Sequence, residues 1–185
     1  MLNFLRTIPQ YLVPQKLLSK LLGMLASQRF AQQTVIKWFV KHYQVDMSQA
    51  KHPDLKHYKN FNDFFIRQLK DGVRPFDDSK NIIVSPVDGK VSQIGDTKEG
   101  RIIQAKKRDY SVTELLGGEL STSESFMEGK FTTLYLSPRD YHRIHMPIDG
   151  TLKEMTYLPG DLFAVKPATA DSVPNLFSRN ERLAI

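Results

Sequence analysis

The hydrophobic pattern of this 185-residue chain changes its period near residue 81, and this change constrains the fold most strongly. Up to residue 45, apolar residues recur at helical spacing. From Asn81 onward they occur in short runs separated by turn residues, which is typical of strands: 82–84, 89–94, 101–104, 131–136 and 151–158. One helix is expected among them, because Ser111-Val-Thr-Glu114 is a capping-box pattern that Gly117-Gly118 closes. We therefore predict an α+β protein, with N-terminal amphipathic helices followed by a mainly antiparallel, β-rich body.

Residues 1–45 form a leader that is both apolar and basic. Its apolar residues include one helical stripe made of Leu17, Leu18, Leu21, Leu22 and Leu25. Pro14 suits the first turn of a helix, and we expect two short helices that break near Ser27. The stretch lacks the roughly 18 consecutive uncharged apolar residues of a spanning helix. An in-plane helix on an anionic membrane fits the pattern, and so does a helical hairpin that packs on the body.

Residues 46–80 connect the leader to the body, which spans residues 81–185. The connection begins as a polar linker, and Phe61–Lys70 then has helical spacing, with Asn60 as N-cap and Gly72 as a stop. The chain has no cysteine, which excludes disulfides, thiolate metal sites and a thiol nucleophile. The net charge is +6, but six basic residues and no acid lie in the leader, which leaves 20 basic and 20 acidic residues elsewhere. We therefore expect no nucleic-acid partner.

The segment Tyr135-Leu-Ser-Pro-Arg-Asp-Tyr-His-Arg-Ile-His-Met-Pro147 is the chemically densest part of the chain. Its two histidines, His142 and His145, have the spacing of metal ligands, but no third ligand is evident nearby and we expect no metal. Asp88-Gly89 by itself is a turn pair between two strands. An aspartate and a histidine are also two thirds of a nucleophile-activating triad, in which the carboxylate orients the imidazole and the imidazole takes a proton. The residues alone leave these interpretations open.

Four motifs, in this order, closely resemble the bacterial phosphatidylserine decarboxylase family, and the resemblance covers essentially the whole chain. They are Ser85-Pro-Val-Asp-Gly-Lys90, the segment 135–147, Tyr157-Leu-Pro-Gly-Asp-Leu-Phe163, and Val173-Pro-Asn-Leu-Phe-Ser-Arg-Asn-Glu-Arg182. The resemblance implies a pyruvoyl-dependent lyase of phospholipid biosynthesis that converts phosphatidylserine to phosphatidylethanolamine and carbon dioxide. It also implies a homodimer, bound peripherally to the cytoplasmic side of the bacterial inner membrane, with an anionic membrane surface as partner.

The resemblance also implies roles for individual residues. In the family, a serine in a Leu-Gly-Ser-Thr motif splits the proenzyme chain and becomes the pyruvoyl group, which serves as an electron sink. Asp88 and His145 resemble the pair that activates this serine. His142 resembles a neighbouring histidine that acts on the substrate, by protonating the carbanion or by positioning the head group. Arg139 or Arg143 is a candidate contact for lipid phosphate, with an exposed ion pair as the alternative.

The sequence departs from the family in one respect, because it contains no Leu-Gly-Ser-Thr. Gly117-Gly-Glu-Leu-Ser-Thr122 looks similar but has two residues between glycine and serine, and it precedes the histidine motif. We therefore expect a fragment of the large β subunit, truncated at the C-terminus, with the pyruvoyl-forming serine beyond Ile185 on the missing α-subunit part. Such a fragment is expected to be inactive alone. The alternatives are a catalytically inactive lipid-binding module and a histidine-dependent metallohydrolase.

Overall fold

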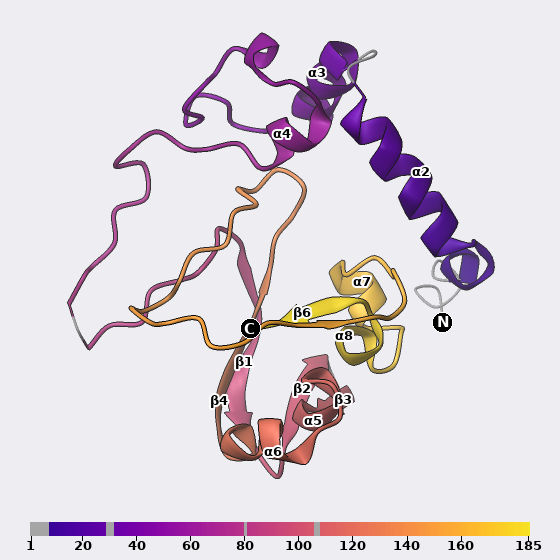
Figure 1. Cartoon of the computed structure of the whole chain (residues 1–185), viewed down its shortest axis with the longest axis vertical. Helices are drawn as coiled ribbons and strands as arrows, with labels where there is room; N and C mark the ends of the chain where they lie inside the picture. Colours follow the sequence, from indigo (N-terminus) through magenta and orange to yellow (C-terminus); the bar gives the residue numbers. More distant parts are fainter. Residues whose placement is uncertain (1–7, 29–31, 80, 106–107) are drawn as a thin grey trace. The chain divides into compact units, whose positions relative to one another are not determined.

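The computed structural model describes residues 8–28, 32–79, 81–105 and 108–185, which fall into two compact units (Figure 1). Unit 1 comprises Met1–Ser19, Val91–Tyr135 and Leu152–Ile185, and unit 2 comprises Lys20–Lys90 and Leu136–Thr151. Helices dominate the N-terminal part. Among the described residues, the strands that follow form three two-stranded sheets: β1 with β4, β2 with β3, and β5 with β6. The predicted α+β class is confirmed, while the predicted division at residues 45 and 80 stays a prediction.

The leader forms the two expected helices, α2 (Gln15–Ser27) and α3 (Gln32–Tyr43). The leucine stripe of α2 is exposed to solvent, with exposed fractions from 45% at Leu18 to 68% at Leu25. In α3, by contrast, Ile36 and Phe39 are buried. Within the described residues, α3 therefore packs as a core helix, while α2 exposes its leucine stripe; the membrane interpretation stays a prediction.

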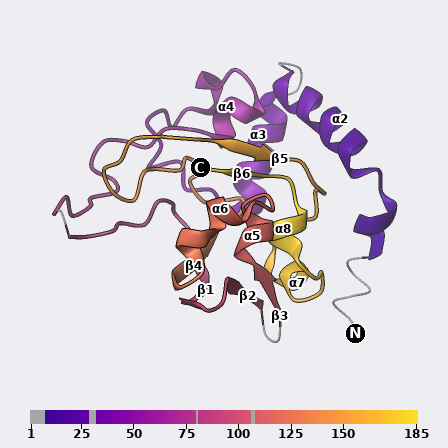
Figure 2. The same ribbon diagram turned by 60° about the horizontal axis from the view of Figure 1, so that its bottom comes forward.

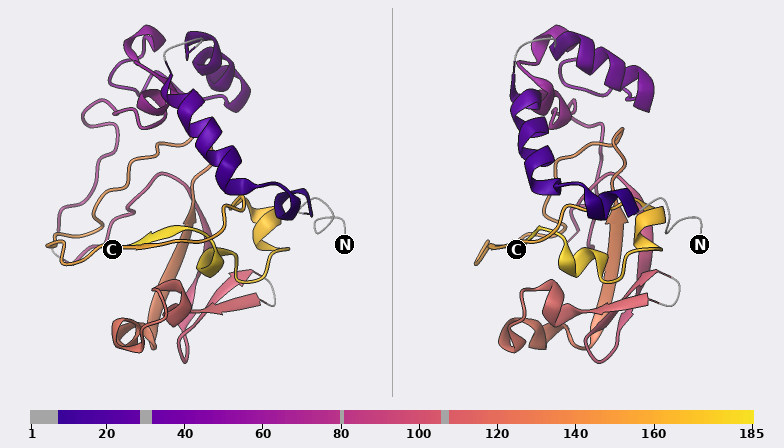
Figure 3. Two further views of the ribbon diagram at one scale, coloured as in Figure 1. Left: turned by 45° about the vertical axis from the view of Figure 1, so that its right-hand side comes forward. Right: turned by 90° about the vertical axis from the view of Figure 1, so that its right-hand side faces the viewer.

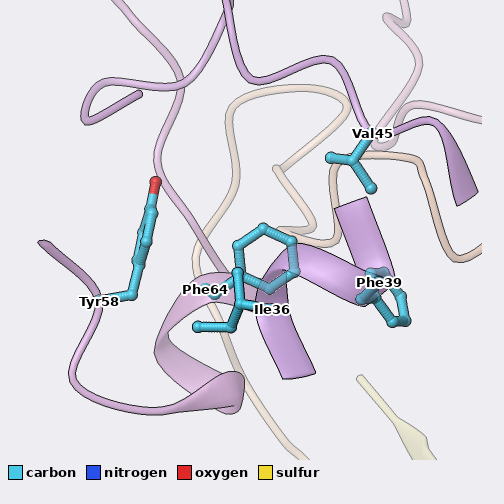
Figure 4. Packing of buried hydrophobic residues seen from close by; sticks show 5 residues of the cluster. All are labelled: Ile36, Phe39, Val45, Tyr58 and Phe64. Carbon is cyan, nitrogen blue, oxygen red and sulfur yellow. The ribbon is translucent and has the colours of Figure 1, made fainter. Parts of the chain in front are cut away.

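The core of unit 2 forms where α3 packs on η1 (Leu55–His57) and α4 (Phe61–Phe65). Figure 4 shows its buried side chains: Ile36, Phe39, Val45, Tyr58 and Phe64. Asn60 caps α4 as predicted, since its Oδ1 accepts a hydrogen bond from Asp63 N at 2.8 Å. In return, Asp63 Oδ2 accepts one from Lys59 N at 3.0 Å. These two hydrogen bonds together fix where α4 begins.

The predicted helix over Phe61–Lys70 is too long, because α4 ends at Phe65. The residues after it pair with the connection instead of continuing the helix. Lys51 N donates to Gln68 O and Lys70 N donates to Gln49 O, both at 2.9 Å. A partner distant in sequence thus overrides the helical periodicity of residues 66–70.

Unit 1 contains β1 (Lys90–Thr97), β2 (Arg101–Ala105) and β4 (Gly129–Tyr135) close to predicted strands, and β3 (Arg108–Ser111), which was not predicted. Figure 1 shows β1 beside β4. β2 and β3 are antiparallel, and Ile102 pairs with Tyr110. The capping box forms α5 (Val112–Leu115), which Gly117 closes at a φ of 109°. Two short helical turns follow, α6 (Leu120–Ser123) and η2 (Glu124–Phe126) (Figure 2).

The C-terminal part of unit 1, yellow in Figure 3, contains α7 (Pro167–Ala170), α8 (Leu176–Arg179) and β6 (Arg182–Ala184). β6 pairs antiparallel with β5 (Thr156–Leu158). The buried side chain of Gln104 ties β2 to this part, since its Nε2 donates to Ala170 O and Val173 O at 2.7 and 2.8 Å. Its Oε1 accepts from Leu176 N at 2.7 Å. One amide thus fixes α7 and α8 against the sheet.

Two predicted strands need correction. Residues 82–84 form no strand, because their one backbone hydrogen bond to a distant residue runs from Val84 N to Pro147 O, at 3.0 Å. Of residues 151–158 only the last three are a strand, where β6 supplies a partner. Pattern reasoning did not find β3 or β6. No helix in the described part of the chain has the length and apolarity to cross a bilayer.

Candidate active site

The site is built from two stretches of unit 2 that are distant in sequence. We call residues 84–88 the aspartate turn and residues 137–147 the histidine segment. His145 N donates to Pro86 O at 2.8 Å, and Val84 N donates to Pro147 O at 3.0 Å. These two hydrogen bonds lay the backbones side by side. The chain therefore brings the predicted residues Asp88 and His145 into one region.

A tight turn starts the histidine segment. Asp140 Oδ2 accepts hydrogen bonds from Ser137 N at 2.6 Å and from Ser137 Oγ at 2.8 Å, while Asp140 N donates to Ser137 O at 2.9 Å. An aspartate side chain that accepts hydrogen bonds from nearby backbone stabilises a turn of this kind. Arg139 extends from the turn, with its Nε 3.9 Å from Asp140 Oδ1.

His142 lies partly buried against α4. Its ring stacks on Phe65, with centroids 4.1 Å apart and an interplanar angle of 23°. Its Nε2 is 3.1 Å from Ser137 O. Burial is the main cause that lowers the pKa of His142, and the positive charge of Arg67 lowers it further. The hydrogen bond to the Ser137 backbone and the charge of Asp140 oppose this lowering. His142 therefore favours the neutral imidazole at neutral pH.

His145 is exposed, in contrast to His142. Its Nε2 is 3.0 Å from the hydroxyl of buried Tyr141, and the two rings stack with centroids 5.6 Å apart. The tyrosine thus holds the imidazole from one side while the other side remains accessible. This is the arrangement expected of a group that exchanges protons with an incoming partner.

Asp88 is bound by an arginine that the sequence reasoning missed. Arg74 donates from Nε to Oδ1 at 2.8 Å and from Nη2 to Oδ2 at 2.6 Å. This bidentate pair raises the pKa of Arg74, with the hydrogen bond to Asp88 as the largest cause. Among the described residues no hydrogen bond joins Asp88 to His145. The fold brings these two residues into one region, and each is held by a different neighbour.

Of the two arginines considered for lipid phosphate, Arg143 makes a contact within unit 2. Arg143 Nε donates to Ile66 O at 2.7 Å, which ties the histidine segment to the end of α4. Within the described ranges no three His, Asp or Glu side chains gather as a metal site would require. Besides Arg74, the sequence reasoning missed Arg67, Phe65 and Tyr141.

Comparison with known proteins gives matches over nearly the whole chain. Residues 61–185 match a family model described as phosphatidylserine decarboxylase, and residues 5–44 match a second one described as PSD. Relatives named phosphatidylserine decarboxylase proenzyme are 56% identical in Vibrio vulnificus (strain YJ016) and 54% identical in Vibrio cholerae (strain ATCC 39315), each over 176 residues. A third relative of the same name, from Pseudoalteromonas translucida, is 56% identical.

The match covers a larger share of this chain than of each relative. It covers 94% of this chain but 62% of each Vibrio relative and 61% of the Pseudoalteromonas relative. The aspartate turn and the histidine segment both lie inside the region that the first family model matches.

Proposed function

This chain belongs to the phosphatidylserine decarboxylase family, and from that membership we propose that the full-length protein converts phosphatidylserine to phosphatidylethanolamine and carbon dioxide. One observation carries the proposal: the family match includes both halves of the site, and the hydrogen bonds of His145 and Val84 hold those halves together. The chain spans 62% of the length of the Vibrio vulnificus relative. The activity is therefore assigned to the full-length protein.

In this proposal His145 and Asp88 serve chain splitting. The exposed ring of His145 accepts the proton of a serine hydroxyl, which belongs to the part of the relatives that this chain does not span. Tyr141 fixes the ring for this transfer through its hydroxyl, 3.0 Å from Nε2. Asp88, in the same region, supplies the negative charge that stabilises the imidazole once it carries the proton. Arg74 keeps the Asp88 carboxylate in one orientation, because it holds both oxygens.

His142 is assigned to the substrate. The two roles open to it are protonation of the carbanion and positioning of the head group. Burial against Phe65 favours positioning, because a neutral imidazole is a poor proton donor and does not repel the ammonium group of phosphatidylserine. His142 thus contributes to turnover rather than to chain splitting.

The cofactor in this proposal is a pyruvoyl group made from the serine that His145 activates. The residues present fit such a group, since an exposed imidazole lies beside a carboxylate-bearing turn. The group would supply an electron sink for the electrons left when the carboxylate departs. This chain supplies the histidines and the aspartate around it, and the α-subunit part supplies the group itself.

The leader is assigned to the membrane. The exposed leucines of α2 suit insertion among lipid acyl chains, and Lys16 and Lys20 beside them suit contact with anionic head groups. Each basic residue near such a surface adds about 1 kcal/mol of attraction. We place the protein peripherally on the cytoplasmic side of the bacterial inner membrane. Homodimerisation remains part of the proposal through family membership alone.

The test is a direct assay of the full-length protein. Incubation with vesicles that contain phosphatidylserine is expected to give phosphatidylethanolamine and carbon dioxide in equal amounts, and vesicles of phosphatidylcholine serve as the control. Full-length protein that has split its chain and still forms no phosphatidylethanolamine would overturn the assignment.

A further inference from the structure

Arg67 is a buried arginine just beyond the end of α4, with 4% of its surface exposed. Its Nη2 donates to two backbone carbonyls of the histidine segment, Arg139 O at 3.2 Å and Asp140 O at 3.4 Å. Its guanidinium also lies over the ring of Phe64, with 5.5 Å between Cζ and the ring centroid. These contacts lie within unit 2. Arg67 therefore joins the core of that unit to the backbone just before His142.

The connection is reciprocal. Arg67 donates from the α4 side to the histidine segment, and Arg143 donates from the histidine segment back to Ile66 O. Between them, His142 stacks on Phe65. Residues 65–67 thus hold the histidine segment through the Phe65 stack, the Arg67 side chain and the Ile66 carbonyl, which accepts from Arg143. The end of α4 is the platform on which the histidines are placed.

Packing alone does not explain an arginine at position 67. Among the described residues no carboxylate lies within ion-pair distance of it, and its Nε and Nη1 have no hydrogen-bond partner. Burial lowers the pKa of Arg67, which reflects the cost of desolvating the charged form. An apolar side chain of similar volume would fill such a place at a lower cost. What arginine adds is a rigid donor group that reaches two neighbouring carbonyls.

We propose that Arg67 is a positioning residue of the active site: its guanidinium holds the backbone of Arg139 and Asp140 and thereby fixes His142 against Phe65. The inference rests on the proposed function only for its effect on turnover. The claim that Arg67 fixes the position of His142 can be tested on this chain alone. Arg67 is not placed in contact with substrate.

The first experiment is a nuclear magnetic resonance pH titration of the His142 ring in this 185-residue chain. The charged groups that act on His142 are Arg67, whose charge lowers its pKa, and Asp140, whose charge raises it. Replacement Arg67→Met removes the charge and releases the segment, so the pKa of His142 is expected to rise. The ring signals of His142 are also expected to lose the upfield shift that stacking on Phe65 produces.

A second variant separates the donor geometry from the charge. Arg67→Lys keeps a positive charge but replaces the planar guanidinium by a single ammonium group. It is expected to retain the fold and to lose part of the Phe65-induced shift. The matched control is Arg182→Met, in unit 1. Arg182 is also a partly buried arginine that donates to backbone carbonyls, those of Glu114 and Leu115, both at 2.6 Å. This control is expected to leave the titration and the ring shift of His142 unchanged.

The second experiment measures steady-state kinetics of the full-length protein with Arg67→Lys. A misplaced His142 is expected to lower kcat by roughly 10- to 100-fold. KM is expected to change little, because Arg67 does not contact the substrate. A purely structural role would lower the amount of folded protein and leave kcat per folded molecule unchanged.

The outcomes separate the two proposals. If the parent full-length protein fails to decarboxylate phosphatidylserine, the proposed function is wrong, and the titration still decides the role of Arg67. If folded Arg67→Lys keeps the parent titration and the parent ring shift of His142, Arg67 does not position it. The same conclusion follows if Arg182→Met changes the His142 signals as much as the Arg67 variants do.

Discussion

Asp88 and His145 are held by different neighbours, so each can be disturbed separately. Arg74 holds the carboxylate through two hydrogen bonds, and Tyr141 holds the imidazole through one. Neither neighbour was predicted from the sequence. In the proposed function, Asp88 and His145 therefore depend on Arg74 and Tyr141 to hold them in place.

Replacing Arg74 tests this dependence. The Arg74–Asp88 pair is partly exposed, at 45% and 25%, so Arg74→Gln is expected to reduce the free energy of unfolding by less than about 1 kcal/mol. Chain splitting of the full-length protein is expected to slow about tenfold, which corresponds to about 1.4 kcal/mol of barrier. Arg101→Gln is the matched control, since Arg101 pairs with Asp109 on an exposed hairpin. Splitting that is equally fast in both variants would show that Arg74 does not orient Asp88.

His142 makes stability depend on pH in a defined direction. Its pKa is lowered from 6.5 in the folded chain, so the unfolded chain binds its proton at higher pH than the folded chain does. The contribution of His142 is fully present above 6.5 and is lost as pH falls through the folded pKa. Urea unfolding from about pH 7 to pH 5 should show less loss of stability in His142→Asn than in the parent. An identical decline in both would contradict the buried neutral state of His142.

The site residues divide clearly by how far the sequence could predict them. Asp88, His142 and His145 were predicted because they stand in local motifs. Arg67 and Arg74 were not, because their partners lie 72 and 14 residues away, beyond the reach of a periodic pattern. The motifs identified the candidate residues, whose catalytic roles stay predictions, and the arginines that contact this region required the folded chain.

At the scale of elements, local caps and turns were predicted better than the lengths of elements. The side-chain caps at Asn60 and Ser111 are present because each is formed within four residues. The length of α4 was wrong because residues 68 and 70 pair with residues 51 and 49. β6 was missed because a three-residue strand exists only where β5 supplies its partner.

The cap of α4 supports the platform under the histidines. Asn60→Ala removes the acceptor for Asp63 N and is expected to cost about 1 kcal/mol of unfolding free energy. Asn60→Asp keeps an acceptor at the same place and is the control. Urea unfolding of the three proteins measures both effects. A loss in Asn60→Ala no greater than in Asn60→Asp would mean that the cap does not stabilise α4.

The exposed stripe of α2 makes a prediction about membranes. Leu21→Gln combined with Leu25→Gln is expected to weaken flotation with anionic vesicles at least about tenfold, because two apolar side chains no longer enter the interface. Ser19→Gln, off the stripe, is the control. Point substitutions are preferable to deletion of residues 1–45, since deletion would remove Ile36 and Phe39 from the core. Unchanged flotation of the double variant would refute the assignment of α2.

At the scale of the whole molecule, the two units contribute differently. Unit 2 contains Asp88, both histidines and the arginines that hold them, together with most of α2. Unit 1 contains the three two-stranded sheets of the described chain, and its core gathers around Phe163, Leu176 and Ile102. In the proposed function, the part of the relatives that this chain does not span brings the serine to the site of unit 2.

The central claim is that His145, with Asp88, drives chain splitting, while His142 serves turnover. The most direct measurement is the intact mass of the full-length parent, His145→Ala and His142→Ala. We predict two chains for the parent and for His142→Ala, with lowered decarboxylation in the latter, and a single unsplit chain for His145→Ala. Normal splitting of His145→Ala would contradict the account.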